Sequence, residues 1–230
     1  MVIREDGQFP QGFFNRDDPT DDTDFYSSPR LVTHIDDAAI AAVGDLYEEL
    51  GLNGDVLDLM SSWVSHFRVT PRRLTVLGMN AEELAANEQA ADRVVHDLNA
   101  DPSLPFDDAT FDAAVSCASV DYLIRPVEVF TDVARVVRPD GLFVCTFSNR
   151  CFPTKAIHGW LYSTDEQHCA VVASYFHKSG AWDEPVAQRR TPVDHRGDPL
   201  YAVWATKRGT SSSALTTTIS REDNSGTASD

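Results

Sequence analysis

Basic residues are scarce in this chain of 230 residues, which has 36 Asp and Glu side chains against 19 Lys and Arg and a formal net charge of −17. Only three of the bases are Lys, and 26 of the acids are Asp. Because so negative a field repels phosphate groups, the composition argues against a nucleic-acid partner and against an anionic membrane surface. It is typical of a protein from a high-salt cytoplasm, where salt screens the self-repulsion, and equally of an ordinary acidic cytosolic protein.

Long apolar runs and cysteine pairs are also missing. No stretch reaches the roughly 18 apolar residues that a membrane-spanning helix needs, and the N-terminal sequence lacks the apolar core of a signal peptide. The cysteines form no C-x-x-C pair and no Cys/His metal pattern, so we expect reduced thiols, no bound metal and a cytoplasmic location. They are Cys117, Cys145, Cys151 and Cys169.

Motifs of three common enzyme classes are absent as well. The chain has no G-x-S-x-G nucleophile elbow, which argues against an α/β-hydrolase. It has no P-loop, which argues against the nucleotide hydrolases that use one. A nicotinamide-dependent oxidoreductase is a weak alternative, because G-x-G-x-x-G is missing and Gly78 stands where its ribose-binding acid is expected.

The two ends of the chain differ in composition from its middle. Residues 1–24 are polar and Asp-rich towards their end, so we expect a flexible acidic N-terminal arm. Residues 208–230 are rich in Ser and Thr and have almost nothing to bury, which predicts a disordered tail. The folded domain is therefore predicted over residues 25–207.

Helical and strand-like patterns alternate through this middle part. The apolar spacing predicts helices over residues 36–50, 81–91, 126–139 and 163–179, and strands over residues 56–60, 74–78, 94–98, 111–118, 142–148, 185–191 and 200–206. The first five strands are short and almost continuously apolar, which is typical of a parallel sheet covered by helices on both faces. The last two are joined by only eight residues, 192–199, and suit a long hairpin.

Polar residues follow the first three predicted strands. Asp58 lies near the end of the first, Asn80 follows the second, and Asp97 lies at the end of the third. An open α/β sheet binds its ligand beyond the carboxyl ends of its strands, at the point where the strand order reverses. We therefore expect a ligand site formed by these three strand ends.

Four segments resemble, in order and spacing, the class I S-adenosylmethionine-dependent methyltransferases, and most of all the methyltransferase type 11 branch. They are residues 56–67, 76–84, 94–116 and 129–150. The most telling motifs are LPF-D-x-x-FD at 104–112 and R-V-x-x-P-x-G at 135–141. The resemblance covers roughly residues 30–207. It implies an α/β Rossmann-like fold with a mostly parallel seven-stranded sheet and an antiparallel last strand, with S-adenosylmethionine as cofactor.

The first loop of that family reads Asp-x-Gly-x-Gly-x-Gly, and the chain departs from it after Asp58. Met60, Ser62 and Val64 stand in the three glycine places, where glycine normally allows close backbone approach and a positive φ. Ser61 and Ser62 are the residues expected to compensate, because hydroxyl and backbone N–H groups can bind the carboxylate of the cofactor's methionine part.

The family's ribose-binding acid is also replaced, by Gly78. Asn80 is a neutral candidate for its role and equally an N-cap for the helix that follows. The resemblance assigns Asp97 to the adenine amino group and the backbone N–H of Leu98 to the adenine ring. The residues predicted to bind the cofactor are Asp58, Met60, Ser61, Ser62, Asn80, Asp97, Leu98 and Cys117.

The acceptor is expected to approach beyond the fourth strand. Substrate-facing candidates are His34, Asp121, Tyr122 and Asn149. The chain lacks the Asn/Asp-Pro-Pro-aromatic motif of enzymes that methylate nucleic-acid amino groups, which favours a small molecule with a C- or O-nucleophile. No catalytic residue is assigned, because methyl transfer is an in-line displacement that depends largely on proximity. The alternative is a catalytically inactive methyltransferase fold that serves as a binding or regulatory protein.

Overall fold

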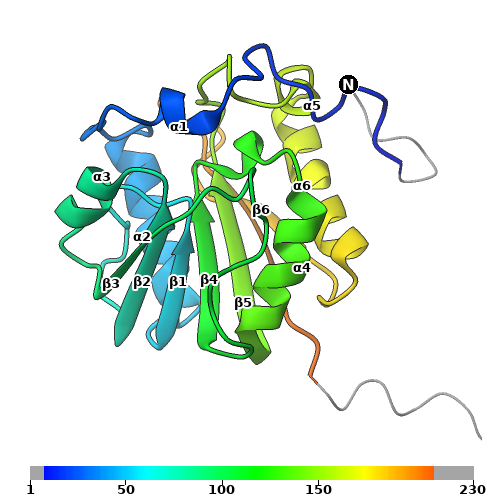
Figure 1. Cartoon of the computed structure of the whole chain (residues 1–230). Helices are drawn as coiled ribbons and strands as arrows, with labels where there is room; N and C mark the ends of the chain where they lie inside the picture. Colours follow the sequence, from blue (N-terminus) through cyan, green and yellow to red (C-terminus); the bar gives the residue numbers. More distant parts are fainter. Residues whose placement is uncertain (1–7, 210–230) are drawn as a thin grey trace, which may run out of the picture.

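The computed structural model describes residues 8–209, which form one seven-stranded sheet in the order β3-β2-β1-β4-β5-β7-β6 (Figure 1). The strands are β1 (Asp55–Leu59), β2 (Arg73–Gly78), β3 (Asp92–Val95), β4 (Phe111–Cys117), β5 (Val137–Phe147), β6 (Val186–Arg189) and β7 (Tyr201–Thr206). β1 to β5 pair in parallel, whereas β7 is antiparallel to both β5 and β6. The predicted Rossmann-like sheet and its antiparallel last strand are therefore confirmed.

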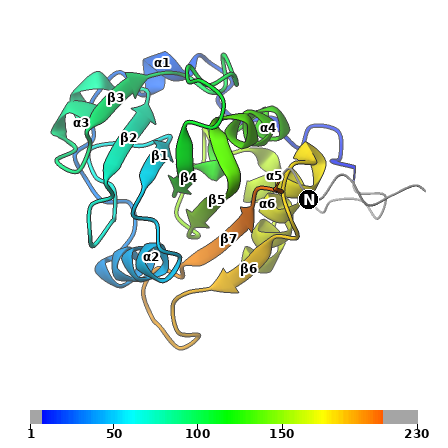
Figure 2. The same cartoon turned by 90° about the horizontal axis from the view of Figure 1, so that it is seen from below.

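Helices cover both faces of this sheet (Figure 2). They are α1 (Asp22–Phe25), α2 (Asp37–Glu49), α3 (Ala81–Ala86), α4 (Pro126–Val136), α5 (His158–Leu161) and α6 (Asp165–Ser179), with a 3-10 turn, η1, at Val120–Tyr122. Successive strand residues face opposite layers. In β5, Val144 packs in the cluster of α2, whereas Phe143 and Cys145 pack in the cluster of α4 and α6.

Local signals explain where several helices begin. The Asp36 side chain accepts a hydrogen bond from the backbone N–H of Ala39 and caps α2. Pro126 opens α4 at a position where a helix needs no N–H donor. Three predicted elements are clearly offset: α3 ends at residue 86 rather than 91, β3 covers residues 92–95 rather than 94–98, and β5 begins at residue 137 rather than 142, inside the helix predicted to run to residue 139.

The connection between β1 and β2 contains no helix. Residues 60–72 run as an irregular segment, although parallel neighbours are usually joined by a helical crossover. Phe67 fills part of the space against α2, with its ring centroid 4.6 Å from that of Tyr47. The substituted glycine loop thus begins a segment whose backbone differs from that of an ordinary crossover.

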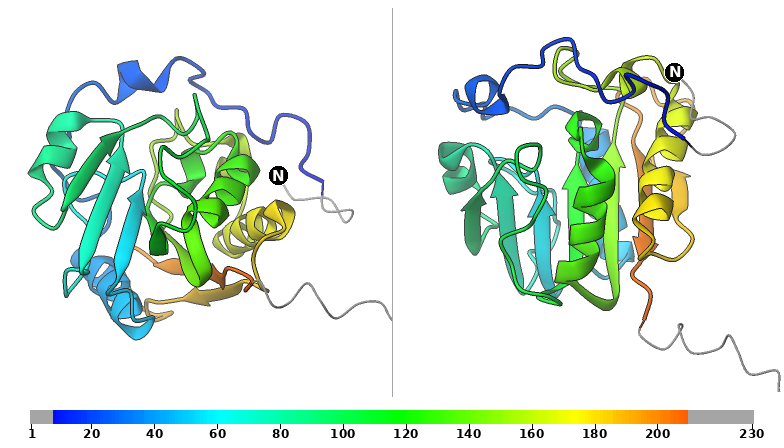
Figure 3. Two further views of the ribbon diagram at one scale, coloured as in Figure 1. Left: turned by 60° about the horizontal axis from the view of Figure 1, so that its bottom comes forward. Right: turned by 45° about the vertical axis from the view of Figure 1, so that its right-hand side comes forward.

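The N-terminal residues cross the carboxyl ends of the strands and pack against the domain (Figure 3). Phe13 is buried, and the fully buried Lys155 ammonium bonds to the carbonyl of Thr20 (2.9 Å) and lies 3.1 Å from Asp18 and 3.2 Å from Asp22. Residues 8–24 therefore pack on the domain instead of forming the loose arm that the sequence predicts, because these buried groups hold them there. Residues 1–7 and the predicted tail beyond residue 209 lie outside the described residues.

None of the helices formed by residues 8–209 combines the length and the apolar character that crossing a membrane requires. Within the same residues, no group of three or more His, Cys, Asp or Glu side chains is arranged to hold a metal ion.

Candidate functional site

A cleft that is partly open to solvent lies at the carboxyl ends of β1, β2 and β4. All eight residues predicted to bind the cofactor line it, and so do His34 and Tyr122. Asp121 and Asn149 do not line it: Asp121 is buried beneath the surface and Asn149 is exposed outside. The structure thus brings together all of the predicted cofactor set and half of the predicted acceptor set.

The backbone after β1 keeps one feature of a glycine loop without the glycine. Met60 has a φ of +53°, a left-handed conformation that costs an L-residue about 1 kcal/mol or more. Ser61 then donates its backbone N–H to the carbonyl of Leu77 (2.8 Å), and its own carbonyl oxygen lies against Gly78. A Cβ on residue 78 would overlap that oxygen. An acid at this position is therefore sterically excluded.

Asp58 anchors this loop from below. Its carboxylate accepts hydrogen bonds from the hydroxyls of Ser61 (2.7 Å) and Ser65 (2.5 Å). Burial raises the pKa of Asp58 to about 6, and the two hydroxyl donors oppose that rise. A cation bound in the cleft would favour the ionised form of this carboxyl. Ser65 is a member of the site that sequence reasoning missed.

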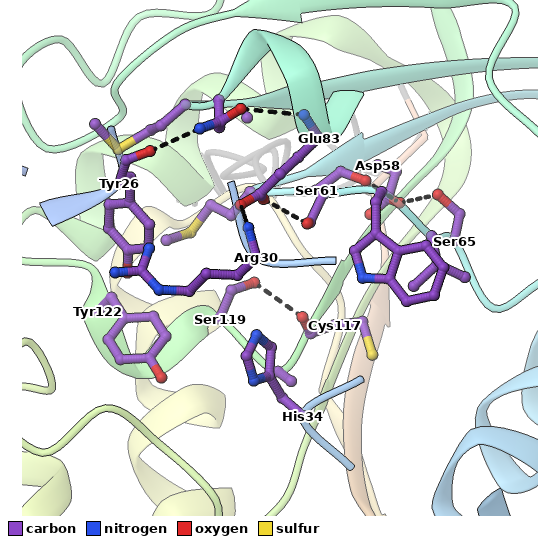
Figure 4. A pocket seen from close by; sticks show the side chains of 18 of the residues that line it. Tyr26, Arg30, His34, Asp58, Ser61, Ser65, Glu83, Cys117, Ser119 and Tyr122 are labelled. Carbon is purple, nitrogen blue, oxygen red and sulfur yellow. Dashed lines mark hydrogen bonds between the residues drawn. The ribbon is translucent and has the colours of Figure 1, made fainter. Parts of the chain in front are cut away.

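Glu83, also missed, is the buried acid at the corner where Gly78 excludes one (Figure 4). Its carboxylate accepts from the Ser62 hydroxyl (2.5 Å) and from the backbone N–H of Arg30 (2.6 Å). It lies in the first turn of α3, three residues after Asn80, and this spacing was the available signal. Glu83 therefore joins the loop after β1 to the N-terminal segment.

Asn80 has the capping role that was one of its two readings. Its Oδ1 accepts from the backbone N–H groups of Glu82 (3.0 Å) and Glu83 (3.1 Å). Its Nδ2 donates to the carbonyls of Tyr26 (2.9 Å) and Ser27 (3.2 Å). The same amide thus begins α3 and holds the segment that crosses the cleft.

Residues 22–35, which we call the roof segment, cover the cleft. The Trp63 indole N–H donates to the carbonyl of Val32 (3.0 Å), and the Arg30 guanidinium lies 4.6 Å from the ring centroid of Phe25. At the other end, Asp22 accepts from Asn99 (2.8 Å) next to the end of β3. Together with the bond from Asn80 to Tyr26, these contacts tie the roof segment to three sides of the cleft.

Asp97 and Leu98 lie at the β3 side of the cleft. One oxygen of Asp97 accepts from the backbone N–H groups of Asn99 (2.8 Å) and Ala100 (3.3 Å) and caps that turn. The second oxygen of Asp97 and the backbone N–H of Leu98 make no hydrogen bond to residues 8–209. One carboxylate oxygen of Asp97 and the backbone N–H of Leu98 are thus available to accept and to donate hydrogen bonds to a ligand.

The acceptor candidates differ in their placement. The Tyr122 hydroxyl accepts from the backbone N–H of Phe152 (2.8 Å) at the edge of the cleft. Asp121 is 2% exposed, and burial raises its pKa to about 7. Because its neighbours enclose it, Asp121 cannot contact an acceptor as expected. Arg150, close to these candidates in the chain, pairs with Asp198 (2.7 Å).

The comparisons agree with this geometry. A family model described as a methyltransferase domain matches residues 54–145, and no curated protein matches the chain. An S-adenosylmethionine-dependent methyltransferase from Mesorhizobium loti has 16% identity and a TM-score of 0.50, with 72% of this chain and 98% of that chain covered. A putative methyltransferase from Bacillus halodurans has 10% identity and a TM-score of 0.52, with 74% and 100% covered.

A third solved structure with this fold, the [4+2]-cyclase SpnF, has 14% identity and a TM-score of 0.54, with 81% of this chain and 92% of that chain covered. At such identities the structural likenesses concern the fold alone. A methyltransferase-domain model thus matches residues 54–145, and the seven-stranded sheet of residues 8–209 has the fold of the solved methyltransferases to which the chain is similar.

Proposed function

We propose that the chain transfers a methyl group from S-adenosylmethionine to a small molecule with a hydroxyl or carbon nucleophile. The observation that carries the proposal is the cleft at the carboxyl ends of β1, β2 and β4, which gathers all eight predicted cofactor residues. Ligands of open α/β sheets bind at this edge.

The polar groups of the cleft fit the cofactor from end to end. The free oxygen of Asp97 and the backbone N–H of Leu98 match the amino group and a ring nitrogen of adenine. We assign the ribose hydroxyls to Glu83 at the β2 corner, because the amide of Asn80 already makes four hydrogen bonds within the protein. Asp58, with the hydroxyl of Ser61, suits the charged methionine end.

When bound, the cofactor supplies a methyl group attached to a positively charged sulfur. The sulfur is the leaving group when an acceptor attacks the methyl carbon in line. The chain's part is then to hold the acceptor in line and to exclude water. The roof segment performs the second task, because its backbone is bound by Asn80, Glu83 and Trp63.

One structural observation favours the alternative, a binding or regulatory protein without turnover. The connection over residues 60–72 contains no helix, so no helix N-terminus directly after β1 offers free N–H groups to an anionic ligand group. Binding and turnover must therefore be measured separately.

The test is calorimetric titration of the full chain with S-adenosylmethionine and S-adenosylhomocysteine, in low salt and in molar salt. We expect binding of both ligands. Failure of both to bind in both buffers contradicts the proposal. A labelled-methyl screen against cell extract then separates the enzyme from a binding protein, because only the enzyme transfers label.

A further inference from the structure

A second cavity, which we call the mouth cavity, opens beside the cofactor cleft and is partly open to solvent. The residues that line both spaces are Thr33, His34, Ile35, Ala118, Tyr122 and Phe152. Because the two spaces share this wall, a molecule in the mouth cavity lies next to a ligand in the cleft. The mouth cavity is therefore the place for an acceptor.

Aromatic rings form the shared wall. The Phe152 ring centroid lies 6.0 Å from that of Tyr122, with the rings tilted by 31°, and 5.1 Å from that of His34, which meets it edge-on. Ile35 adds a buried apolar side chain. Flat apolar surfaces of this kind bind planar rings by offset or edge contacts.

The charged groups of the mouth cavity are already bound to one another. Arg150 pairs with Asp198 (2.7 Å). Asp198 accepts from the backbone N–H of Asp36 (3.0 Å) and donates its own N–H to the Asp36 carboxylate (2.8 Å), which also lies 3.3 Å from His195. Since Arg150, Asp36 and Asp198 are bonded to one another and together carry one positive and two negative charges, the mouth cavity disfavours an anionic acceptor and suits a neutral one.

His34 has proton-accepting capacity that the protein does not use. Neither of its ring nitrogens makes a hydrogen bond to residues 8–209, and Figure 4 places its ring between Tyr122 and Cys117. Although the ring keeps contact with solvent, the surrounding protein lowers its pKa; nearby Glu83 opposes this effect and Arg30 adds to it. The Cys117 thiol, with a pKa raised by burial to about 12, stays protonated beside it.

We propose that the acceptor is a neutral hydroxyaryl compound that lies against Phe152 and Tyr122, and that His34 takes its hydroxyl proton. This inference rests on the proposed function. The acceptor's O–H bond breaks and its proton passes to an imidazole nitrogen of His34. The acceptor oxygen forms a bond to the methyl carbon as the carbon–sulfur bond breaks. The electron pair of that bond stays on sulfur, which gives S-adenosylhomocysteine, and His34 then releases the proton to solvent.

The probe for this step is 4-nitrophenol, whose phenolate absorbs visible light, so that its methylation is followed as a loss of colour. The full chain, first shown to bind S-adenosylhomocysteine, would be given the probe with S-adenosylmethionine at a pH below and at a pH above the pKa of the probe. The wild-type protein is expected to methylate the probe at both pH values. His34→Gln is expected to bind the probe within about threefold of the wild type, to lose about tenfold in rate below that pKa, where the phenol proton must be removed, and to keep its rate above it.

His177→Gln is the matched control, because His177 lies at the exposed end of α6 beside Glu184. It should methylate the probe as the wild type does at both pH values. Phe152→Leu should weaken probe binding by about tenfold, since it removes the aromatic wall. Equal methylation rates of His34→Gln and wild type below the pKa of the probe would overturn the role of His34, and absence of probe binding would overturn the acceptor class. Failure to bind S-adenosylhomocysteine beforehand would instead count against the proposed function.

Discussion

The carbonyl oxygen of Ser61 occupies the space that a side chain on Gly78 would need. This contact links the two departures from the family pattern, the altered loop after Asp58 and the missing acid at the end of β2. The loop is held there by the hydrogen bond from Ser61 to Leu77. The two departures are therefore one structural change, and the acid of this corner comes from Glu83 on α3.

Restoring the acid with Gly78→Asp should destabilise the protein. The new Cβ overlaps backbone, which cannot rotate away, so we expect a loss of about 2 kcal/mol or more in unfolding free energy, measured by urea denaturation. Gly51→Ala is the control: Gly51 has a φ of +67° with open space around it and should lose only about 1 kcal/mol. A Gly78→Asp protein of wild-type stability would show that the loop has room for the acid.

Cofactor affinity should depend on the ionisation of Asp58, whose pKa burial raises to about 6. Since the folded pKa lies above the ordinary pKa of 3.8 for an Asp side chain, this group lowers the unfolding free energy as pH rises from about 4 through 6. A cationic ligand prefers the ionised carboxylate, so affinity should fall by up to about tenfold from pH 7 to pH 5. Calorimetry in two buffers at the lower pH should detect proton release. Asp58→Asn should remove both effects, and an unchanged pH profile in that variant would assign them to another group.

Ser65→Ala should make the Asp58 carboxyl harder to ionise. Ser65 donates to Asp58 and accepts from the Asn87 amide (2.9 Å), so its loss leaves two buried polar groups each short of a partner. We expect a loss of about 1–3 kcal/mol in unfolding free energy and an upward shift in the pH at which ligand affinity falls. A stability loss without that pH shift would mean that Ser65 supports only the loop.

Glu83→Gln should loosen the roof segment. The substitution removes the charge that strengthens the hydrogen bonds from Ser62 and Arg30. Amide hydrogen exchange over residues 26–34 should become about tenfold faster, measured by mass spectrometry. Glu82→Gln, one residue away on the exposed side of α3, should leave that exchange unchanged. Equal exchange in the two variants would contradict a holding role for Glu83.

The fold was largely predictable from sequence because its strands are continuous apolar runs and its helices have local caps. The end of α3 was not predictable. The helix ends at Asn87, whose side-chain amide donates hydrogen bonds to the carbonyl of Ser62 and the hydroxyl of Ser65. No local pattern encodes such a bond.

The cofactor side of the site was predictable because it follows the ends of strands. Glu83 was missed because its bond to Arg30 joins residues 53 positions apart. Asp121 was wrongly predicted to face the acceptor. It is next to Tyr122 in η1, but the Tyr122 side chain lines the cleft whereas the Asp121 side chain is buried behind it. Only the three-dimensional arrangement distinguishes these neighbours.

The most direct test compares the wild type with Asp97→Asn in a calorimetric titration with S-adenosylhomocysteine. The amide keeps the oxygen that caps the turn at Asn99 but places a donor where the adenine amino group needs an acceptor. Asp107→Ala, in an exposed loop, controls for the lost charge. The account predicts that Asp97→Asn weakens binding tenfold or more, about 1.4 kcal/mol, whereas Asp107→Ala binds as the wild type does. Equal binding by all three proteins would contradict the assignment of this cleft to the cofactor.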